Sequence, residues 1–373
     1  MPNVGCGGGV RYFPSGGITS AKGKFSMAHP LSGANLGTLA AVVGRSGLPS
    51  HAGAGAMIGL AALARWPFST AERLATESKL PKIEDMPAPV FILGHWRSGT
   101  THLYNIMCES GEWGYVPPVA TGLPWDLFGL AKVFNPLLEK ALPEHRYIDN
   151  IPVTPTSPQE DEIAIANMSE VSFYHGIYFP KNFAENVNRG LFFDGCSTAD
   201  IRSWRKQFTY FLRKLYLYQG EKPLLIKNPV YTGRFAMLKE MFPDAKFIHI
   251  HRNPYDVFVS MRNFYTKLLG EFALQGYDHI DIDETILSVY ERLMNSYLHD
   301  AEGMPADRLV ELQYDDLDSD PMASVEKTYT DLSLPGFEEA LMGMSPGETK
   351  TASIPSDKAY GARRDDLVAQ VER

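Results

Sequence analysis

The stretch that decides the fold is residues 90–103, which read VFILGHWRSGTTHL. An apolar run leads into a turn framed by Gly94 and Gly99, and a helical stretch follows the turn. This is the outline of a phosphate-binding loop, whose glycines let the backbone approach an anion and whose helix supplies N–H donors. A Walker-type loop has lysine after its second glycine, whereas this chain has Thr100 there and carries its cation inside the loop, at Arg97. We therefore expect an anion other than the magnesium triphosphate of an ATPase.

Strands alternate with helices from residue 89 onward. Apolar runs predict strands at 89–93, 223–226, 246–251 and 308–314, each followed by an amphipathic stretch of helical period. Alternation of this kind predicts an α/β fold with a P-loop-type parallel sheet flanked by helices. An insertion rich in proline and aromatic residues, at about 110–220, is expected to form a helical cap over the substrate side of the sheet.

The part of the chain before this domain has a different character. Residues 1–24 are rich in glycine and serine and are expected to be a flexible tail, and residues 25–87 are expected to form an N-terminal helical extension. Its segment 46–64 has no charged residue, but proline and glycines dilute it, so a buried or interfacial helix is favoured over a membrane span. The segment indicates contact with a lipid-like molecule or with the surface of a membrane. The α/β domain with its cap would then occupy residues 88–373.

Composition limits the partners and the location. The chain has 373 residues and a net charge of −9, so a nucleic-acid partner is not expected. Cys6, Cys108 and Cys196 are too few and too scattered for a disulfide scaffold or a zinc site. No charged head precedes a long apolar core at the N-terminus, so a secretory signal is not expected. These features favour a cytoplasmic protein, with membrane association left open.

Cationic side chains follow three of the predicted strands. Arg97 lies in the glycine loop, Lys227 follows the second strand and Arg252 follows the third. Because the carboxyl ends of parallel strands meet at one edge of a sheet, the three cations are expected to converge there. A positive pocket in an acidic chain is a suitable anion site.

Two motifs resemble those of the sulfotransferases that use 3′-phosphoadenosine 5′-phosphosulfate (PAPS). GHWRSGTTHL, at 94–103, looks like their 5′-phosphosulfate loop, and RNPYDVFVS, at 252–260, looks like their 3′-phosphate motif. The arginine in the loop and the KNP element at 227–229 are similar to the bacterial branch related to tyrosylprotein sulfotransferases. The resemblance covers about residues 88–320. The RKG element of cytosolic relatives is not found, although Arg363 or Arg364 would be a substitute for it.

The resemblance implies metal-free, in-line transfer of a sulfuryl group from PAPS to a hydroxyl of a small-molecule or lipid-like acceptor. The abundant aromatic residues of the cap suit an apolar alcohol or a phenol. Arg252 and Ser260 would hold the 3′-phosphate, and Lys227 would steady the bridging oxygen as it leaves. His102 would lie near the adenine. The residues expected to cradle the phosphosulfate are Arg97, Ser98, Gly99, Thr100 and Thr101.

The general base stays open between two carboxylates. Tyrosylprotein relatives have a glutamate shortly after the first helix, where this chain reads GYVPPVATGLP and has no acid. The next acidic stretch is SPQEDEIAI, at 157–165, in which Glu160 and Glu162 are the candidates and His102 and His175 are outsiders. Ser157 and Glu160 also have the spacing of a capping box, which would make at least one of Glu160, Asp161 and Glu162 purely structural.

Two other functions are compatible with the sequence. A nucleotide or small-molecule kinase with a degenerate loop would require magnesium and ATP. A non-catalytic protein that keeps the nucleotide site would bind adenosine 3′,5′-bisphosphate and transfer nothing. Titrations with adenosine 3′,5′-bisphosphate, ATP and AMP, with and without magnesium, separate the kinase from the other two.

Overall fold

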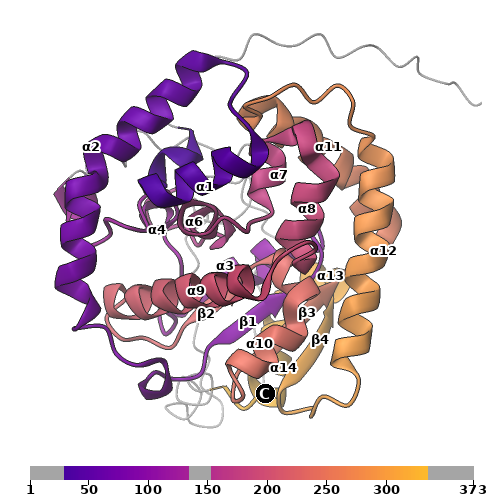
Figure 1. Cartoon of the computed structure of the whole chain (residues 1–373). Helices are drawn as coiled ribbons and strands as arrows, with labels where there is room; N and C mark the ends of the chain where they lie inside the picture. The colour runs from indigo at the N-terminus through magenta and orange to yellow at the C-terminus, as the bar shows by residue number, and fades with distance from the viewer. Residues whose placement is uncertain (1–28, 134–152, 335–373) are drawn as a thin grey trace, which may run out of the picture.

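A parallel four-stranded sheet lies at the centre of the molecule (Figure 1), in a computed structural model that describes residues 29–133 and 153–334. The strand order is β2-β1-β3-β4, and every neighbouring pair is parallel. The strands are β1 (Val90–Leu93), β2 (Leu225–Lys227), β3 (Lys246–His251) and β4 (Leu309–Gln313). They confirm the expected α/β fold, with strand ends that differ from the predicted ones by one or two residues.

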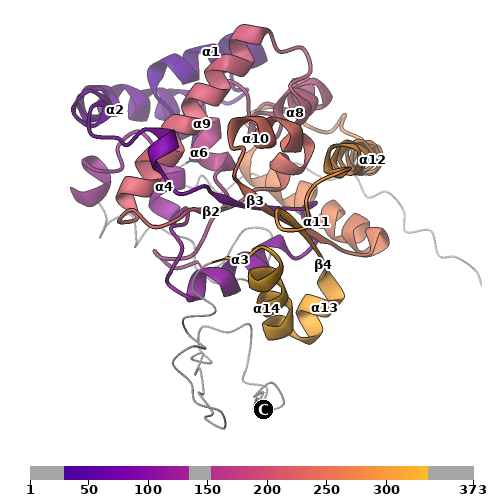
Figure 2. The same cartoon turned by 90° about the horizontal axis from the view of Figure 1, so that it is seen from below.

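Helices cover both faces of the sheet (Figure 2). Val90 and Ile92 of β1 join a buried cluster with one layer of helices, and Phe91 and Leu93 join a larger cluster on the other side. The alternation follows from the two-residue period of a strand, and it explains why a strand buried on both faces is apolar throughout. The first layer contains α3 (Thr100–Glu109), α13 (Tyr314–Ser319) and α14 (Pro321–Asp331). The second layer contains α9 (Thr198–Tyr218), α10 (Phe235–Met241), α11 (Pro254–Phe272) and α12 (Ile282–Ala301).

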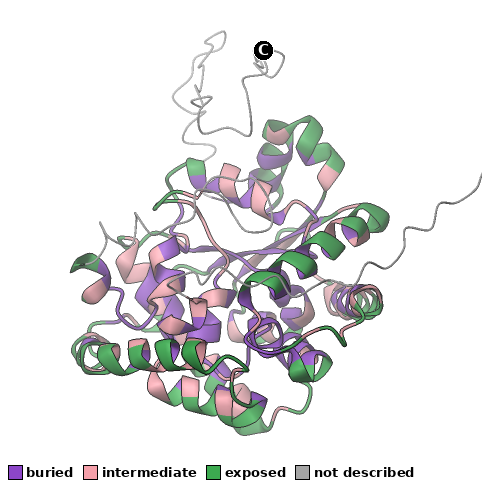
Figure 3. Cartoon of the chain, turned by 90° about the horizontal axis from the view of Figure 1, so that it is seen from above, coloured by how far each residue is buried: buried purple, intermediate pink, exposed green. Residues whose placement is uncertain are grey.

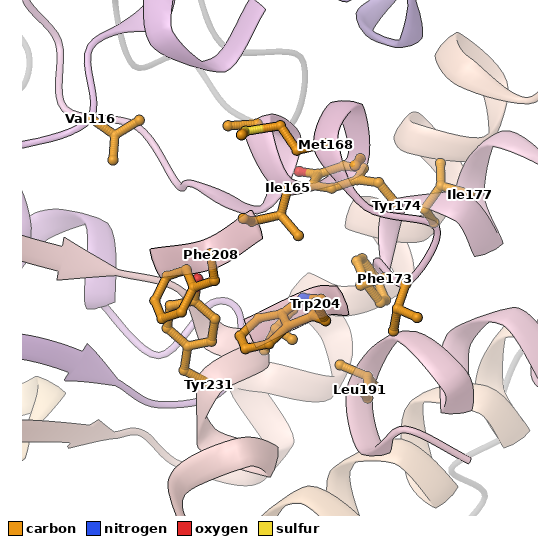
Figure 4. Close-up of a cluster of buried hydrophobic side chains, with 14 of the residues drawn as sticks. Val116, Ile165, Met168, Phe173, Tyr174, Ile177, Leu191, Trp204, Phe208 and Tyr231 are labelled. Carbon is orange, nitrogen blue, oxygen red and sulfur yellow. The ribbon is translucent and has the colours of Figure 1, made fainter. Parts of the chain in front are cut away.

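The insertion between α3 and β2 is helical over its described part, as the sequence predicts. It contains α4 (Pro118–Gly122), α6 (Glu162–Met168), α7 (Tyr174–Tyr178), α8 (Phe183–Phe192) and α9. Many of its aromatic side chains belong to the core, where Phe173, Trp204 and Phe208 converge with Ile165 and Tyr231 (Figure 4). Figure 3 shows the strands and the inner sides of the helices buried, with exposed residues on the outer turns.

Two helices precede the sheet, α1 (Leu36–Ser46) and α2 (Ala52–Glu77). The uncharged segment 46–64 contributes the first half of α2, which continues through Pro67. Short 3₁₀ turns complete the described elements, at Pro30–Gly33, Ile83–Asp85, Pro180–Asn182 and Pro229–Arg234. None of the described helices has the length and apolar character needed to cross a membrane. The proposed tail at 1–24 lies outside the described residues, and the division of the chain at residue 88 stays a prediction.

Candidate active site

The loop between β1 and α3 depends on two glycines in conformations that other residues rarely adopt. Gly94 has φ of 138° and Gly99 has φ of 96°. A Cβ at Gly94 would lie 2.3 Å from the carbonyl oxygen of Ile250, and a Cβ at Gly99 would lie 2.3 Å from the ring of Tyr314. Both positions therefore require glycine, because the loop turns tightly against β3 and the start of α13. The first-turn N–H groups of α3 then point into the space at the carboxyl edge of the sheet.

Side chains hold this loop in place from below. The Thr232 hydroxyl accepts the Gly94 N–H at 2.8 Å and lies 3.1 Å from the Gly94 carbonyl oxygen. The Ser98 hydroxyl is 2.7 Å from the His95 carbonyl oxygen and 3.0 Å from that of Ile250, and Ser98 is buried. Ser98, expected among the phosphosulfate ligands, thus directs its hydroxyl into the loop rather than toward the pocket. Its contact with a donor molecule stays a prediction.

The structure brings together predicted residues from both nucleotide motifs. Arg97 has φ of 68°, in the left-handed region, and its Nε donates to Ser260 Oγ at 2.8 Å. Ser260 lies on α11, two turns beyond Arg252, which follows β3 directly. The Arg252 guanidinium stands 4.4 Å from the ring centroid of Tyr314, at the end of β4. The glycine loop at 94–103 and the motif at 252–260 therefore meet at one edge of the sheet.

A second cluster joins the end of β2 to the loop. Lys227 Nζ is 2.5 Å from Glu160 Oε1 and 3.1 Å from Thr101 Oγ1. The Lys227 side chain is 2% exposed and that of Glu160 is 13% exposed, so water enters only from the carboxylate side. Two of the predicted residues, Thr101 of α3 and Glu160 in the segment before α6, are thus within hydrogen-bond distance of the ammonium of a third, Lys227 of β2.

The structure separates the two candidate bases. Glu162 Oε1 accepts the Ser172 hydroxyl at 2.7 Å and the Phe173 N–H at 2.9 Å, and its Oε2 accepts the Asn228 amide at 3.0 Å. Burial raises the pKa of Glu162, and the positive charge of nearby Arg234 opposes this rise. Glu162 is therefore a buried, hydrogen-bonded carboxylate, whereas Glu160 is the one that faces Lys227.

The expected capping box is wrong. Helix α6 begins at Glu162 rather than after Ser157, and the Ser157 hydroxyl accepts the Thr154 N–H at 2.8 Å. Before this helix, the chain is instead held by hydrogen bonds between Asp161 and residues that follow β2. Asp161 accepts the Asn228 amide at 2.8 Å and also the Tyr231 hydroxyl.

Sequence reasoning missed the roles of Asp161, Asn228 and Tyr231. Asn228 bridges the two acidic side chains, and burial raises the pKa of Asp161 to about 7. The available signal was the position of Asn228 inside the KNP element, directly after a predicted strand. Asn228 therefore fixes the acidic segment against β2, and this brings Glu160 to Lys227.

The two histidines have different surroundings. His102 is half-buried in the first turn of α3, and burial lowers its pKa, with the Asp318 carboxylate acting in the opposite direction. Its proposed place near the adenine stays a prediction. His175 is buried with Nε2 3.0 Å from the Ala166 carbonyl oxygen, and burial lowers its pKa to about 4. His175 thus lies in the core, away from the strand ends.

Within the described residues, no group of three or more His, Cys, Asp or Glu side chains is placed to hold a metal ion. Arg363 and Arg364 lie outside the described residues.

The geometry is that of a phosphate-binding α/β protein whose cations gather at the strand ends. The model of the family described as "Sulfotransferase family" matches residues 89–339, so the chain belongs to this family. It is 32% identical over 254 residues to the omega-hydroxy-beta-dihydromenaquinone-9 sulfotransferase Stf3 of Mycobacterium tuberculosis and of Mycobacterium bovis. The matched segment is 67% of this chain, and it spans only 64% of the length of these curated relatives.

Solved structures agree with the fold. The sulfotransferase STF1 of Mycobacterium tuberculosis superposes with a TM-score of 0.57 at 17% identity, over 82% of this chain and 84% of that one. The sulfotransferase STF9 of Mycobacterium avium has a TM-score of 0.57 at 16% identity, over 81% of this chain and 84% of that one. At these identities the likeness concerns the fold alone.

A second similarity concerns the C-terminal end. The model of the FKBP-type peptidyl-prolyl cis-trans isomerases matches residues 325–369. The short-type peptidyl-prolyl cis-trans isomerase of Methanocaldococcus jannaschii is 47% identical over 38 residues, which are 10% of this chain and 24% of that protein. Arg363 and Arg364 fall in the segment matched by this second family, so the family comparison gives them no support as a substitute for the RKG element.

Proposed function

We propose that the chain transfers the sulfuryl group of PAPS to a hydroxyl of an apolar, lipid-like acceptor. The observation that carries the proposal is the Lys227 ammonium, which lies within 2.5 Å of a carboxylate and 3.1 Å of the loop hydroxyl of Thr101. Transfer to a hydroxyl needs a cation at the leaving oxygen and a base at the attacking oxygen. Lys227 and Glu160 supply a cation and a carboxylate side by side, next to Thr101 of the loop.

The site suits the nucleotide of such a donor. Gly99 lets the loop turn closely against the Tyr314 ring, and the first turn of α3 offers amide donors. Arg97 and Arg252 supply guanidinium forks, which match the oxygens of phosphate and sulfate groups. We propose that Arg97, Gly99, Thr100 and Thr101 bind the phosphosulfate and that Arg252 and Ser260 bind the 3′-phosphate.

The bond changes assign a task to each residue. The bond between the sulfuryl sulfur and the bridging 5′-phosphate oxygen breaks, and a bond from sulfur to the acceptor oxygen forms. Negative charge collects on the leaving phosphate, where Arg97 and Lys227 stabilise it. The proton of the attacking acceptor hydroxyl passes to the Glu160 carboxylate, which is within hydrogen-bond distance of Lys227 and is partly open to solvent.

Two observations support the acceptor class and the location. The similar mycobacterial proteins are named for an omega-hydroxylated dihydromenaquinone, so we propose a lipid-like alcohol or quinol for this chain as well. A lipid acceptor implies peripheral contact with a membrane, for which the N-terminal helical region is the proposed element. Cys108 and Cys196 are free thiols, in keeping with a cytoplasmic location.

A transfer assay tests the proposal directly. The protein is incubated with PAPS carrying radioactive sulfur and with omega-hydroxylated quinols, long-chain alcohols or phenols, and the sulfated product is measured. We expect transfer to apolar alcohols without added metal and tight binding of adenosine 3′,5′-bisphosphate in a calorimetric titration. Binding of that nucleotide without transfer to any acceptor would favour the non-catalytic alternative. Magnesium-dependent binding of ATP in its place would favour the kinase.

A further inference from the structure

Helix α2 buries Ile58 and Ala62 but also turns charged side chains inward, while its large apolar side chains are turned outward. A surface helix normally presents apolar residues to the core and polar residues to water. Here the inward face carries Arg65 and Glu72, while large apolar side chains stand on the outside. The helix lies at the periphery of the molecule (Figures 1 and 2). This inversion requires an explanation in terms of what surrounds the outer face.

The inward charges attach α2 to the body of the protein. Arg65 Nε donates to Asp126 Oδ2 at 2.9 Å, and its other nitrogens bond carbonyl oxygens of the 3₁₀ turn at Pro30–Gly33. Glu72 is 2.6 Å from the ammonium of Lys214, a fully buried side chain of α9. The Glu72 carboxylate also accepts the N–H groups of Phe128 and Gly129. The inward charges of α2 therefore have partners inside the protein, and together with buried Ile58 and Ala62 they fix the orientation of the helix.

The outer face is apolar over most of the length of the helix. Six large side chains on it are between 53% and 70% exposed: Met57, Leu60, Leu63, Trp66, Phe68 and Leu74. From residue 46 to residue 64 no charged side chain interrupts this face. Scattered exposed apolar residues are ordinary, but a continuous apolar row on one helix marks an interaction surface.

A row of cations borders the apolar row. Along α9 the only acid is Asp200, whereas Arg202, Arg205, Lys206 and Arg213 lie outside the core. Arg205 is paired with Glu240, and Arg213 donates to the carbonyl oxygens of Leu80 and Pro81, so Arg202 and Lys206 are the cations of this border that face solvent. A cavity of about 560 Å³ between α2 and α9 is lined by Arg73 and Leu74 from one helix and by Lys206, Tyr210 and Arg213 from the other. The apolar row and the cations are therefore adjacent parts of one surface, in a protein of net charge −9.

We propose that this surface, the outer face of α2 with the basic border of α9, docks on an anionic phospholipid bilayer. The inference deepens the proposed function and rests on it, because a lipid-like acceptor is met at a membrane surface. The apolar side chains of α2 enter the boundary between headgroups and acyl chains. Trp66 fits this boundary because its indole ring is apolar and carries one N–H donor. The exposed cations Arg202 and Lys206 of α9 face lipid phosphates, each contributing an attraction that salt weakens.

Charge argues for a bilayer rather than a second copy of the chain. A twofold dimer through α2 would bring the basic borders of both copies into one interface, where like charges repel. A surface of anionic lipids is complementary to the same border. A helix that lies in the bilayer surface also needs no spanning length, in agreement with the lack of a spanning helix among the described residues.

Co-sedimentation of the full chain with vesicles tests the proposal. The vesicles are pure phosphatidylcholine or a mixture of phosphatidylglycerol and phosphatidylcholine. The test variant carries Leu60→Ser and Leu63→Ser. The matched control carries Leu287→Ser and Leu298→Ser on α12, at positions that are 56% and 61% exposed. A third protein, Lys206→Glu, probes the basic border.

We expect the wild type to bind the mixed vesicles more tightly than the neutral ones, with affinity falling as salt rises. The α2 variant should bind at least about tenfold more weakly, since two leucines no longer enter the bilayer, whereas the α12 control should bind like the wild type. Lys206→Glu should reduce the preference for anionic vesicles. Failure of the wild type to bind either vesicle, or equal binding by the α2 variant, would overturn the proposal. So would a wild-type dimer that the α2 variant converts to a monomer.

Two further measurements keep this proposal separate from the enzymatic one. Calorimetry with adenosine 3′,5′-bisphosphate and turnover of a short, water-soluble alcohol should be unchanged in all three variants. If the protein binds vesicles but transfers no sulfuryl group, the proposed function is wrong and the docking surface is supported. If it transfers sulfuryl groups but binds no vesicles, the docking surface is wrong and the proposed function is supported.

Discussion

Replacing Glu160 by glutamine tests the assignment of the general base most sharply. The carboxylate stands 2.5 Å from Lys227 Nζ, and glutamine keeps its size and one acceptor oxygen while losing the capacity to take a proton. General base catalysis contributes about 10²–10⁴-fold to a rate, so kcat should fall by a factor in that range. The affinity for adenosine 3′,5′-bisphosphate should change little, because Glu160 contacts Lys227 and not Arg252 or Ser260, the proposed ligands of the 3′-phosphate.

The same substitution has a structural consequence that must be measured. The Lys227 side chain is only 2% exposed, and breaking a buried ion pair by removing one partner costs about 3–5 kcal/mol. Glutamine retains a hydrogen bond to the ammonium, and Thr101 Oγ1 remains 3.1 Å away, so the loss of stability should be well below that range. Thermal unfolding of the variant checks this point before any rate is interpreted.

Glu162→Gln is the matched control, two residues away. The two carboxylate oxygens of Glu162 accept three hydrogen bonds in the core. In glutamine an NH₂ group replaces one of these oxygens, and because NH₂ cannot accept a hydrogen bond, at least one of the three is lost. We expect a loss of about 1–3 kcal/mol in the free energy of unfolding, with kcat of the folded fraction near the wild-type value.

Single-turnover rates with labelled PAPS distinguish the two carboxylates. Glu160→Gln should slow the transfer step by the factor expected for kcat, whereas Glu162→Gln should leave it near the wild-type rate. The assignment would be refuted if Glu160→Gln kept a kcat within about tenfold of the wild type, or if Glu162→Gln slowed the transfer step as strongly.

Three other substitutions have defined outcomes. Arg97→Ala should lower turnover at least about a hundredfold, since losing one preorganised donor raises the barrier by about 3–4 kcal/mol. The melting temperature should stay the same, and a near-normal kcat would remove Arg97 from the mechanism. Gly99→Ala should abolish binding of adenosine 3′,5′-bisphosphate in calorimetry, because its Cβ would lie 2.3 Å from the Tyr314 ring, whereas Gly53→Ala in α2 meets nothing within 4 Å and should leave binding intact. Asp161 has its pKa raised by burial from 3.8 to about 7, so its contribution to stability is present below pH 3.8 and is lost as pH rises through 7. Asp161→Asn should therefore flatten the decline in the free energy of unfolding over that window, and an unchanged slope in chemical denaturation would contradict this account.

The amino-acid sequence by itself determined the sheet and the place of the anion site. Apolar runs with the period of a strand, glycines before a helix and cations after strands are local signals, and they act over a few residues. Parallel strands then bring their carboxyl ends to one edge, which is why Arg97 and Ser260 meet although the predicted motifs lie far apart in the chain.

The tertiary structure alone decided which acid contacts Lys227 and which face of α2 is buried. Glu160 and Glu162 are equivalent in sequence, and only the distant partners Lys227 and Asn228 distinguish them. The apolar segment of α2 fits a buried helix equally well by its composition. Its outward orientation follows from the ion pair between Glu72 and Lys214, because buried charges must find partners and those partners come from another part of the chain.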